Sequence, residues 1–149
     1  MPSAEKVART DTGLASALRV SVARLSRRMR AERDPANEML PVGQLSVLGL
    51  LNRYGDSTIG ELATLERVQP PSMTRTVNCL VDGHYVERRR SESDGRQVVV
   101  ALAPLGEQTL AADRRRRNAW LAQRLRELTP DERSVLRQAA PILERLAHA

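Results

Sequence analysis

With 149 residues, 41% hydrophobic and 28% charged, the chain is long enough for one globular domain, but one Trp, two Tyr and no Phe exclude an aromatic core and favour aliphatic helix packing. The single cysteine excludes an intrachain disulfide, and no signal peptide or membrane-spanning run is apparent, so we expect a soluble, cytoplasmic protein without a membrane partner. A net charge of +6, carried almost entirely by arginine, favours a polyanionic partner, although GC-rich codon usage would explain much of the arginine excess.

The first predicted helix begins near Leu14, and we expect the largely polar residues 1–10 to be frayed. From Leu14 to Met29 apolar residues recur at helical spacing, with arginines between them. Asp34-Pro35 should end this helix, because the residue before a proline avoids the helical region. After a loop, a second helix is predicted at 42–54, closed by a Gly-Asp turn.

A short helix and a proline-initiated helix follow. In the stretch TIGE, Thr58 matches the capping residue of a capping box and Glu61 matches the residue that returns the hydrogen bond. The helix that starts here should run only to about Glu66. After a few residues of turn, Pro70 and Pro71 mark the start of the next helix, because proline is favoured at the first helical position.

The proline-initiated helix has two distinct faces. Its apolar face holds Met73, Val77, Leu80 and Val81, and the opposite face holds Pro71, Arg75, Asn78 and Asp82. A short helix, a turn and a second helix with a polar outward face predict a helix-turn-helix. We also expect free backbone N–H groups in the first turn of this second helix, where they would favour phosphate.

Two β-rich runs, at 86–90 and 97–102, are joined by the turn-forming loop 91–96. A hairpin directly after a helix-turn-helix is typical of a wing. Beyond it, a long helix is predicted from Pro104 to Leu128. A capping box at Thr129–Glu132, with Pro130 in the first helical position, opens a last helix that Pro141 should kink or cut short.

Several motifs at fixed spacing carry a family resemblance. They are SMTRTVNCL at 72–80, Val86 with Arg88, DGR at 94–96 and LAPLGE at 102–107, and the spacing from Arg75 to the hairpin is the most diagnostic feature. From about Leu14 to Leu146 the chain resembles the MarR family of bacterial transcriptional regulators. The resemblance implies a mainly α fold with a small β-hairpin wing, in which residues 42–103 form the DNA-binding lobe and residues 1–33 and 104–149 provide dimerisation helices.

The same resemblance implies what the protein binds. Members of the family typically bind pseudo-palindromic double-stranded DNA as homodimers, and many are released by small, often phenolic, ligands. Three positions depart from the family pattern: His84 stands where glycine is usual, Ala103 replaces a capping Thr, and the first helix lacks the cysteine of the redox-sensing branch. Histidine tolerates the left-handed conformation better than most residues, whereas the lost cap should cost about 1 kcal/mol.

Ten residues are candidates for contact with DNA. Arg75 can form a fork onto a guanine edge in the major groove, and Arg96 at the wing tip suits the minor groove. By resemblance, Asp94 positions the wing; of the arginines at 88–90 at most two can face the duplex together, and only for phosphate contacts. The full set is Gln69, Pro71, Ser72, Thr74, Arg75, Asn78, Arg88, Arg90, Asp94 and Arg96. The alternative is that Ser72 and Thr74 only satisfy local backbone groups and that Arg75 is a solvated surface residue.

Other conspicuous residues favour ordinary structural roles. The arginine run 114–117 must wrap around its helix, because successive helical residues turn by about 100°, so it cannot form one binding stripe. Cys79 falls on the outward face without a resolving cysteine, which favours an inert thiol. His84 and His148 are too few and too scattered for a metal site, and nothing indicates a cofactor.

We therefore interpret the sequence as that of a sequence-specific, homodimeric transcriptional regulator, with a repressor favoured over an activator. One alternative is a sequence-tolerant architectural DNA-binding protein, which would bind any duplex with similar affinity. Another is a winged-helix module for protein–protein interaction, which would not bind DNA. An enzyme is the weakest alternative, because no nucleophile–base pair, carboxylate dyad or phosphate loop is recognisable.

Overall fold

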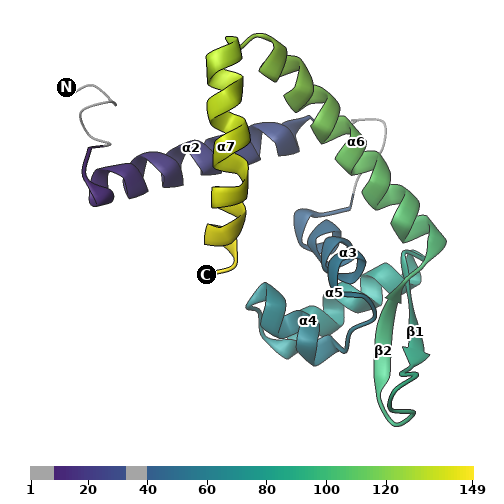
Figure 1. The fold of residues 1–149 in the computed structure, drawn as a ribbon. Helices are drawn as coiled ribbons and strands as arrows, with labels where there is room; N and C mark the ends of the chain where they lie inside the picture. The colour runs from purple at the N-terminus through teal and green to yellow at the C-terminus, as the bar shows by residue number, and fades with distance from the viewer. Residues whose placement is uncertain (1–8, 33–39) are drawn as a thin grey trace. The chain divides into compact units, whose positions relative to one another are not determined.

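The computed structural model describes residues 9–32 and 40–149 (Figure 1). Along the chain follow α2 (Asp11–Ala31), α3 (Val42–Tyr54), α4 (Ile59–Glu66), α5 (Pro70–Asp82), β1 (Val86–Arg90), β2 (Val98–Leu102), α6 (Pro104–Arg126) and α7 (Pro130–Ala147). The predicted fold class, mainly helical with a hairpin, is confirmed. The polar N-terminal residues before Arg9 and the predicted helix stop at Asp34-Pro35 lie outside the described residues.

The chain divides into two compact units. The winged lobe, residues 40–115, contains α3, α4, α5, the hairpin and the first part of α6. The helical unit contains residues 9–32 and 116–149, that is, α2, the second part of α6 and α7. Among the described residues, no helix is long and apolar enough to span a membrane.

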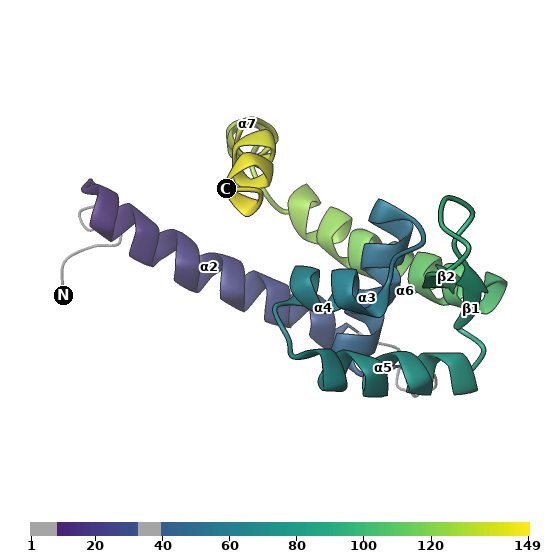
Figure 2. The same ribbon diagram turned by 90° about the horizontal axis from the view of Figure 1, so that it is seen from below.

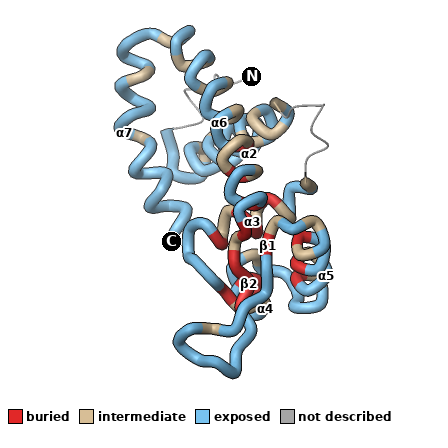
Figure 3. The backbone as a smooth tube through the Cα atoms, turned by 90° about the vertical axis from the view of Figure 1, so that its right-hand side faces the viewer, coloured by how far each residue is buried: buried red, intermediate tan, exposed pale blue. Residues whose placement is uncertain are grey.

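The winged lobe has an aliphatic core, as the composition predicted. The core is lined by the inward faces of its helices and by the hairpin, as the red segments of Figure 3 show. Its buried members are Leu45, Val47, Leu48, Leu51, Leu62, Ala63, Met73, Val77, Leu80, Val86, Val100 and Leu110. Tyr85 packs against this cluster without being fully buried. Packing of this kind orients α4 and α5 as a helix-turn-helix.

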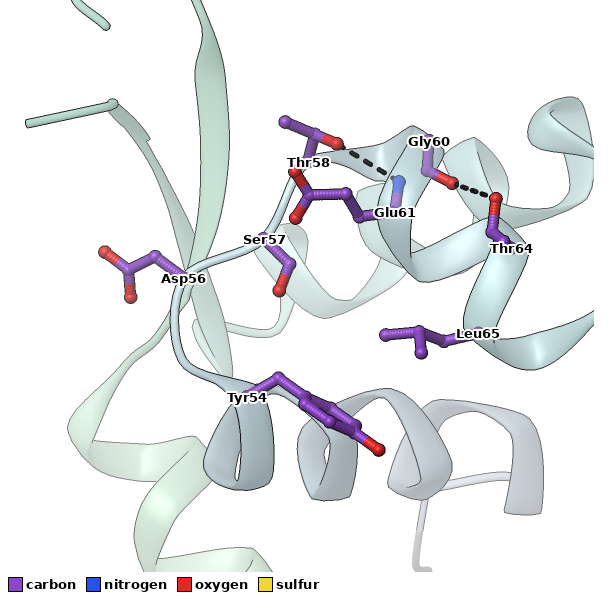
Figure 4. A pocket seen from close by; sticks show the side chains of 8 residues that line it. All are labelled: Tyr54, Asp56, Ser57, Thr58, Gly60, Glu61, Thr64 and Leu65. Carbon is purple, nitrogen blue, oxygen red and sulfur yellow. Dashed lines mark hydrogen bonds between the residues drawn. The ribbon is translucent and has the colours of Figure 1, made fainter. Parts of the chain in front are cut away.

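Local signals set the ends of α4 and α5. At the start of α4 the Thr58 hydroxyl accepts a hydrogen bond from the amide of Glu61 at 3.1 Å, as Figure 4 shows, but the described residues lack the reciprocal bond of a full capping box. The helix ends at Glu66, as predicted, with Arg67 in the left-handed region at φ 55° and ψ 44°. Three residues later α5 begins at Pro70.

The end of α5 has a left-handed cap with a histidine in the place of a glycine. His84 has a φ of 63°, and its amide donates to the Val81 carbonyl at 3.0 Å. The Tyr85 amide donates to the Leu80 carbonyl at 2.9 Å. These two bonds form a Schellman motif, with His84 in the position that glycine usually takes. The expectation that histidine would preserve this cap is confirmed.

The hairpin is antiparallel, with Val86 opposite Leu102 and Arg90 opposite Val98. A short contact that the sequence did not predict extends it. The Ser57 amide donates to the Val100 carbonyl at 3.1 Å, and the Val100 amide donates to the Ser57 carbonyl at 2.7 Å. This bridge attaches the base of the wing to the segment between α3 and α4.

The junction between the wing and α6 requires a glycine. A Cβ atom on Gly106 would lie closer to the Tyr85 carbonyl oxygen than van der Waals contact allows. The Ala103 amide donates to the same carbonyl at 3.1 Å. The start of α6 is therefore held directly against the short segment between α5 and β1. This close approach gives a physical reason for the glycine in the LAPLGE motif.

In the helical unit, α2 starts at Asp11, three residues before the predicted start, because Thr10 caps it by accepting from the Gly13 amide at 3.0 Å. The capping box of α7 is complete: the Glu132 amide donates to the Thr129 hydroxyl at 3.2 Å, and the Thr129 amide donates to the Glu132 carboxylate at 2.8 Å. Of the two effects predicted for Pro141, a kink or an early end, the early end is wrong, since α7 continues to Ala147.

Candidate nucleic-acid interface

The two faces of α5 divide as the sequence predicted. Met73, Val77 and Leu80 are buried in the core of the winged lobe, whereas Arg75 and Asn78 are exposed. Figure 2 shows α5 along one side of the lobe, with α3 and α4 on its inner side. The helix therefore presents a polar surface of the width that a major groove accepts.

The N-terminus of α5 differs from the prediction. Pro70 and Pro71 have no N–H groups, and the amides of Ser72 and Met73 both donate to the Gln69 carbonyl, at 3.0 and 3.2 Å. The first turn therefore has no free N–H group from Pro70 onward with which to hold a phosphate, and that expectation is wrong. Any direct hydrogen bond to a phosphate at this end must come from a side chain or from the Gln69 amide.

The hydroxyl groups of α5 are partly committed to the helix itself. Thr74 donates to the Pro70 carbonyl at 3.0 Å, and Thr76 donates to the Ser72 carbonyl at 3.1 Å. Thr74 thus keeps only acceptor capacity for an outside partner. Arg75 makes a long contact of 3.5 Å from its Nη2 atom to the Ser72 hydroxyl, which is weak enough to be exchanged for a base edge.

Two candidate residues from different elements contact each other. The Arg88 guanidinium, on β1, donates to the Asn78 side-chain oxygen, on α5. The pair connects α5 to the wing and leaves the amide nitrogen of the exposed Asn78 available as a donor. Arg88 is therefore placed to orient Asn78, and its availability for a phosphate contact is reduced.

Arg89 has partners on the other side of the hairpin. Its guanidinium binds the Glu87 carboxylate at 2.7 Å and lies 3.8 Å from Asp56. The hydrogen bond to Glu87 and the charges of Glu87 and Asp56 raise the pKa of Arg89, so this guanidinium stays charged. Since its charge is matched by carboxylates, Arg89 contributes less to a DNA surface than the exposed Arg90, whose side chain points to the Arg88 face of the strand.

Asp94 organises the wing loop. Its side-chain oxygen accepts from the Arg96 amide at 3.1 Å, and its carbonyl accepts from the Gln97 amide at 3.0 Å. The Ser91 hydroxyl in turn accepts from the Asp94 amide at 3.3 Å. These contacts fix the backbone that carries Arg96, whose side chain is exposed at the tip.

Other conspicuous features lie apart from this surface or add little to it. Cys79 is exposed on α5. In the run 114–117, the first two arginines are exposed and the last two are half-buried, as expected for residues that wrap around a helix.

A hollow of about 560 Å³ lies between the end of α3 and the start of α4, where Tyr54 and Leu65 form its apolar side (Figure 4). The described residues contain no cluster of metal-binding side chains.

The residues that sequence reasoning missed are those defined by distant contacts. Ser57 at the base of the wing and Asp56 beside Arg89 gave no periodic or motif signal. The blocked N-terminus of α5 was visible in the sequence, because the two prolines can be counted as missing donors.

A helix-turn-helix with an exposed polar face, followed by a wing with arginines at its tip and along β1, defines a winged helix-turn-helix protein. The MarR family model matches residues 40–98, most of the winged lobe. An HTH-type transcriptional regulator of Mycobacterium tuberculosis is 44% identical over 134 residues, which are 90% of this chain and 92% of that protein.

Solved structures agree with this assignment. A transcriptional regulator from Pseudomonas aeruginosa is 33% identical with a TM-score of 0.80, and the match covers 95% of this chain and 98% of the other. A MarR family protein from Bacillus stearothermophilus is 26% identical with the same TM-score of 0.80, over 95% of this chain and 97% of the other. The chain belongs to the MarR family and is a transcriptional regulator, which implies that it binds DNA.

Proposed function

We propose that this regulator is a homodimer that binds a pseudo-palindromic operator in a sequence-specific manner and represses transcription. One observation carries the DNA-binding part of the proposal: α5 presents an exposed polar face, and the wing that follows it carries Arg96 on a loop fixed by Asp94. A helix and an arginine-bearing loop so arranged can enter adjacent major and minor grooves.

In this proposal, the residues of α5 read bases and those of the wing sense the backbone and groove shape. Arg75 forms two hydrogen bonds with a guanine edge, and Asn78, oriented by Arg88, donates to a base from its amide nitrogen. Gln69, Pro71, Ser72 and Thr74 line the start of the same helix, and Arg90 contacts phosphate. Arg96 enters the minor groove, where negative potential attracts a cation.

The helical unit supports a dimer. Its helices α2 and α7 have no buried residue, yet each carries an apolar stripe. The exposed apolar residues are Leu14, Leu18, Val22 and Leu25 on α2, and Val135, Leu136, Ile142, Leu143 and Leu146 on α7. Exposed apolar stripes of this kind mark a candidate interface, and the occupant we propose is a second copy. The dimerisation helices then come from 1–33 and 104–149, and the DNA-binding lobe from 42–103.

We further propose that a small, aromatic effector releases the operator, a part of the proposal that rests on family membership alone. The repressor role rests on the same basis.

The proposal is tested by selecting bound sequences from a random duplex library and titrating the selected operator against a scrambled duplex. A sequence-specific regulator should enrich a two-fold symmetric motif with half-sites about one helical turn apart, and should prefer it by about 10³-fold or more. Equal affinity for both duplexes would favour the architectural alternative. An absence of salt-dependent DNA binding would favour the protein-interaction alternative.

A further inference from the structure

The turn of the helix-turn-helix contains a residue in an unfavourable backbone conformation. Arg67, between α4 and α5, has φ 55° and ψ 44°, inside the left-handed region. Glycine occupies this region freely, Asn and Asp are enriched in it, and an arginine there is uncommon because its Cβ approaches the following carbonyl. The only other non-glycine residue with positive φ among the described residues is His84.

The main-chain hydrogen bonds around Arg67 explain its left-handed conformation, but they do not explain why the residue is an arginine. The Arg67 amide donates to the Thr64 carbonyl at 3.2 Å, and the Val68 amide donates to the Ala63 carbonyl at 3.0 Å, which closes α4 with a left-handed residue. Both bonds use only main-chain atoms, so glycine would make them equally well and without strain. The main-chain hydrogen bonds therefore give no reason for an arginine at this position.

The Arg67 side chain lacks an internal partner. It is exposed and takes part in none of the side-chain hydrogen bonds or ion pairs among the described residues. Two arginines of β1 do have partners, since Arg88 binds Asn78, and Arg89 binds Glu87 and Asp56. Arg67 instead resembles the exposed Arg96 at the wing tip, whose side chain is also free for a partner outside the chain. Strained backbone conformations cluster at functional sites.

The place of Arg67 suggests which ligand it would meet. It lies three residues before Pro70, at the entrance to the helix whose first turn has no free N–H group from Pro70 onward. Helix-turn-helix proteins commonly hold DNA phosphate at the N-terminus of the recognition helix through backbone amides. In this chain the prolines remove those donors, and the nearest preceding cation is Arg67.

We infer that Arg67 is a further DNA-binding residue: it contacts a backbone phosphate at the N-terminal end of α5 and replaces the amide donors that Pro70 and Pro71 lack. The inference deepens the proposed function and rests on it. The competing role is purely structural, a positive charge beside the C-terminal end of the α4 dipole. The two roles differ in whether removal of the charge changes DNA binding.

The test compares Arg67→Gly, Arg67→Asn and Arg67→Lys with the wild type on the selected operator and on a scrambled duplex, each at several salt concentrations. Arg67→Gly should raise Tm by about 2–4 °C, because it relieves the left-handed strain. It should nevertheless weaken binding to both duplexes by about tenfold and lower the magnitude of the salt slope by about two, one lost phosphate contact per protomer. Arg67→Asn should weaken binding in the same way, whereas Arg67→Lys should keep most of the slope.

Arg24→Gln is the matched control, because it removes one exposed positive charge from α2, in the helical unit. It should leave the affinity within about twofold of the wild type and the salt slope unchanged. If Arg67→Gly and Arg67→Asn bind like the wild type with unchanged slope, Arg67 serves only α4 and the inference is overturned. If the wild type itself shows no salt-dependent DNA binding, the proposed function fails first and this inference fails with it.

Discussion

The winged lobe and the helical unit use apolar residues in opposite ways. In the lobe, Leu48, Leu62, Val77 and Leu80 are each 0% exposed, and the surrounding side chains close one continuous core. In the helical unit, α2 and α7 bury no residue completely, and Val135 and Leu146 on α7 remain 63% and 59% exposed. The lobe thus satisfies its hydrophobic surface within one chain.

This difference supports the proposed place of a second copy. A folded chain keeps a large apolar surface only where a partner covers it, and the surface of the helical unit is arranged as stripes on two helices. The polar face of α5 and the wing tip, by contrast, expose arginines for a polyanion. We therefore propose that the helical unit forms the dimer interface and that the winged lobe binds DNA.

The largest expected effect comes from charging the stripe of α7. The double substitution Leu136→Asp and Leu143→Asp places two carboxylates in the proposed interface and should convert the dimer to monomer at micromolar concentration. Operator affinity should fall by about 10²-fold or more, because the two lobes no longer bind as a linked pair. Light scattering and operator titration measure the two effects.

Leu65→Asp provides the control for that comparison. Leu65 is 43% exposed on α4, close to the exposure of Leu136, but it belongs to the winged lobe. Its substitution should leave the mass in solution unchanged. A dimer that survives in the α7 variant, or that is lost in Leu65→Asp, would show that the apolar stripes are not the interface.

The next largest effect concerns the core of the lobe. Leu48→Ala should lower the free energy of unfolding by about 2–5 kcal/mol, because it leaves a cavity at a site without solvent exposure. Urea denaturation followed by circular dichroism measures this loss. Leu48→Met, which nearly conserves volume, should cost less than about 1.5 kcal/mol. A loss below about 1 kcal/mol in Leu48→Ala would mean that the core is less tightly packed than the structure shows.

Arg75→Ala sharpens the DNA-binding side of the comparison. It should cost about 1–3 kcal/mol per half-site and flatten discrimination at one operator position, because Arg75 is proposed to read a base edge. Titration against operators with each base at that position gives the result. If Arg75→Ala weakens operator and scrambled duplex equally, α5 holds only the backbone, and the architectural alternative replaces the proposed function.

Arg96→Ala is the contrasting variant on the wing. Since Arg96 is proposed to sense groove width and charge, its loss should weaken binding to both duplexes and lower the salt slope by about one unit per phosphate equivalent on each wing. Discrimination at single base positions should remain nearly as in the wild type. A selective loss on the operator alone would move base readout to the wing.

The last variant, Cys79→Ser, is expected to have no effect on DNA binding. Cys79→Ser should keep operator affinity with or without peroxide, because Cys79 is a lone exposed thiol in a chain without a second cysteine. Gel-shift titration before and after mild oxidation measures this. Loss of binding in the oxidised wild type that is absent from Cys79→Ser would assign the thiol a redox role.

The sequence was sufficient for the features that local chemistry determines. The bounds of α3, α4 and α5 follow from the Gly-Asp turn, the Thr58 cap and Pro70, each of which acts within a few residues. The complete capping box at Thr129 was predictable for the same reason. The early end predicted at Pro141 did not occur, because a proline inside α7 removes one hydrogen bond without necessarily ending the helix.

Features that depend on distant contacts were not predictable. The bridge between Ser57 and Val100 and the pair of Asn78 with Arg88 join segments that only the folded lobe brings together. The left-handed conformation of Arg67 had no signal in its residue type, which disfavours that region. The phosphate expectation at α5 failed for a different reason, because the donors that two prolines remove had not been counted.

The mass of the unmodified chain in solution tests most directly whether the helical unit forms a dimer interface. Light scattering at micromolar concentration should give about twice the chain mass of 16.6 kDa, because α2 and α7 then cover their apolar stripes with a second copy. A mass of one chain under these conditions would leave those stripes without an occupant and would contradict the account.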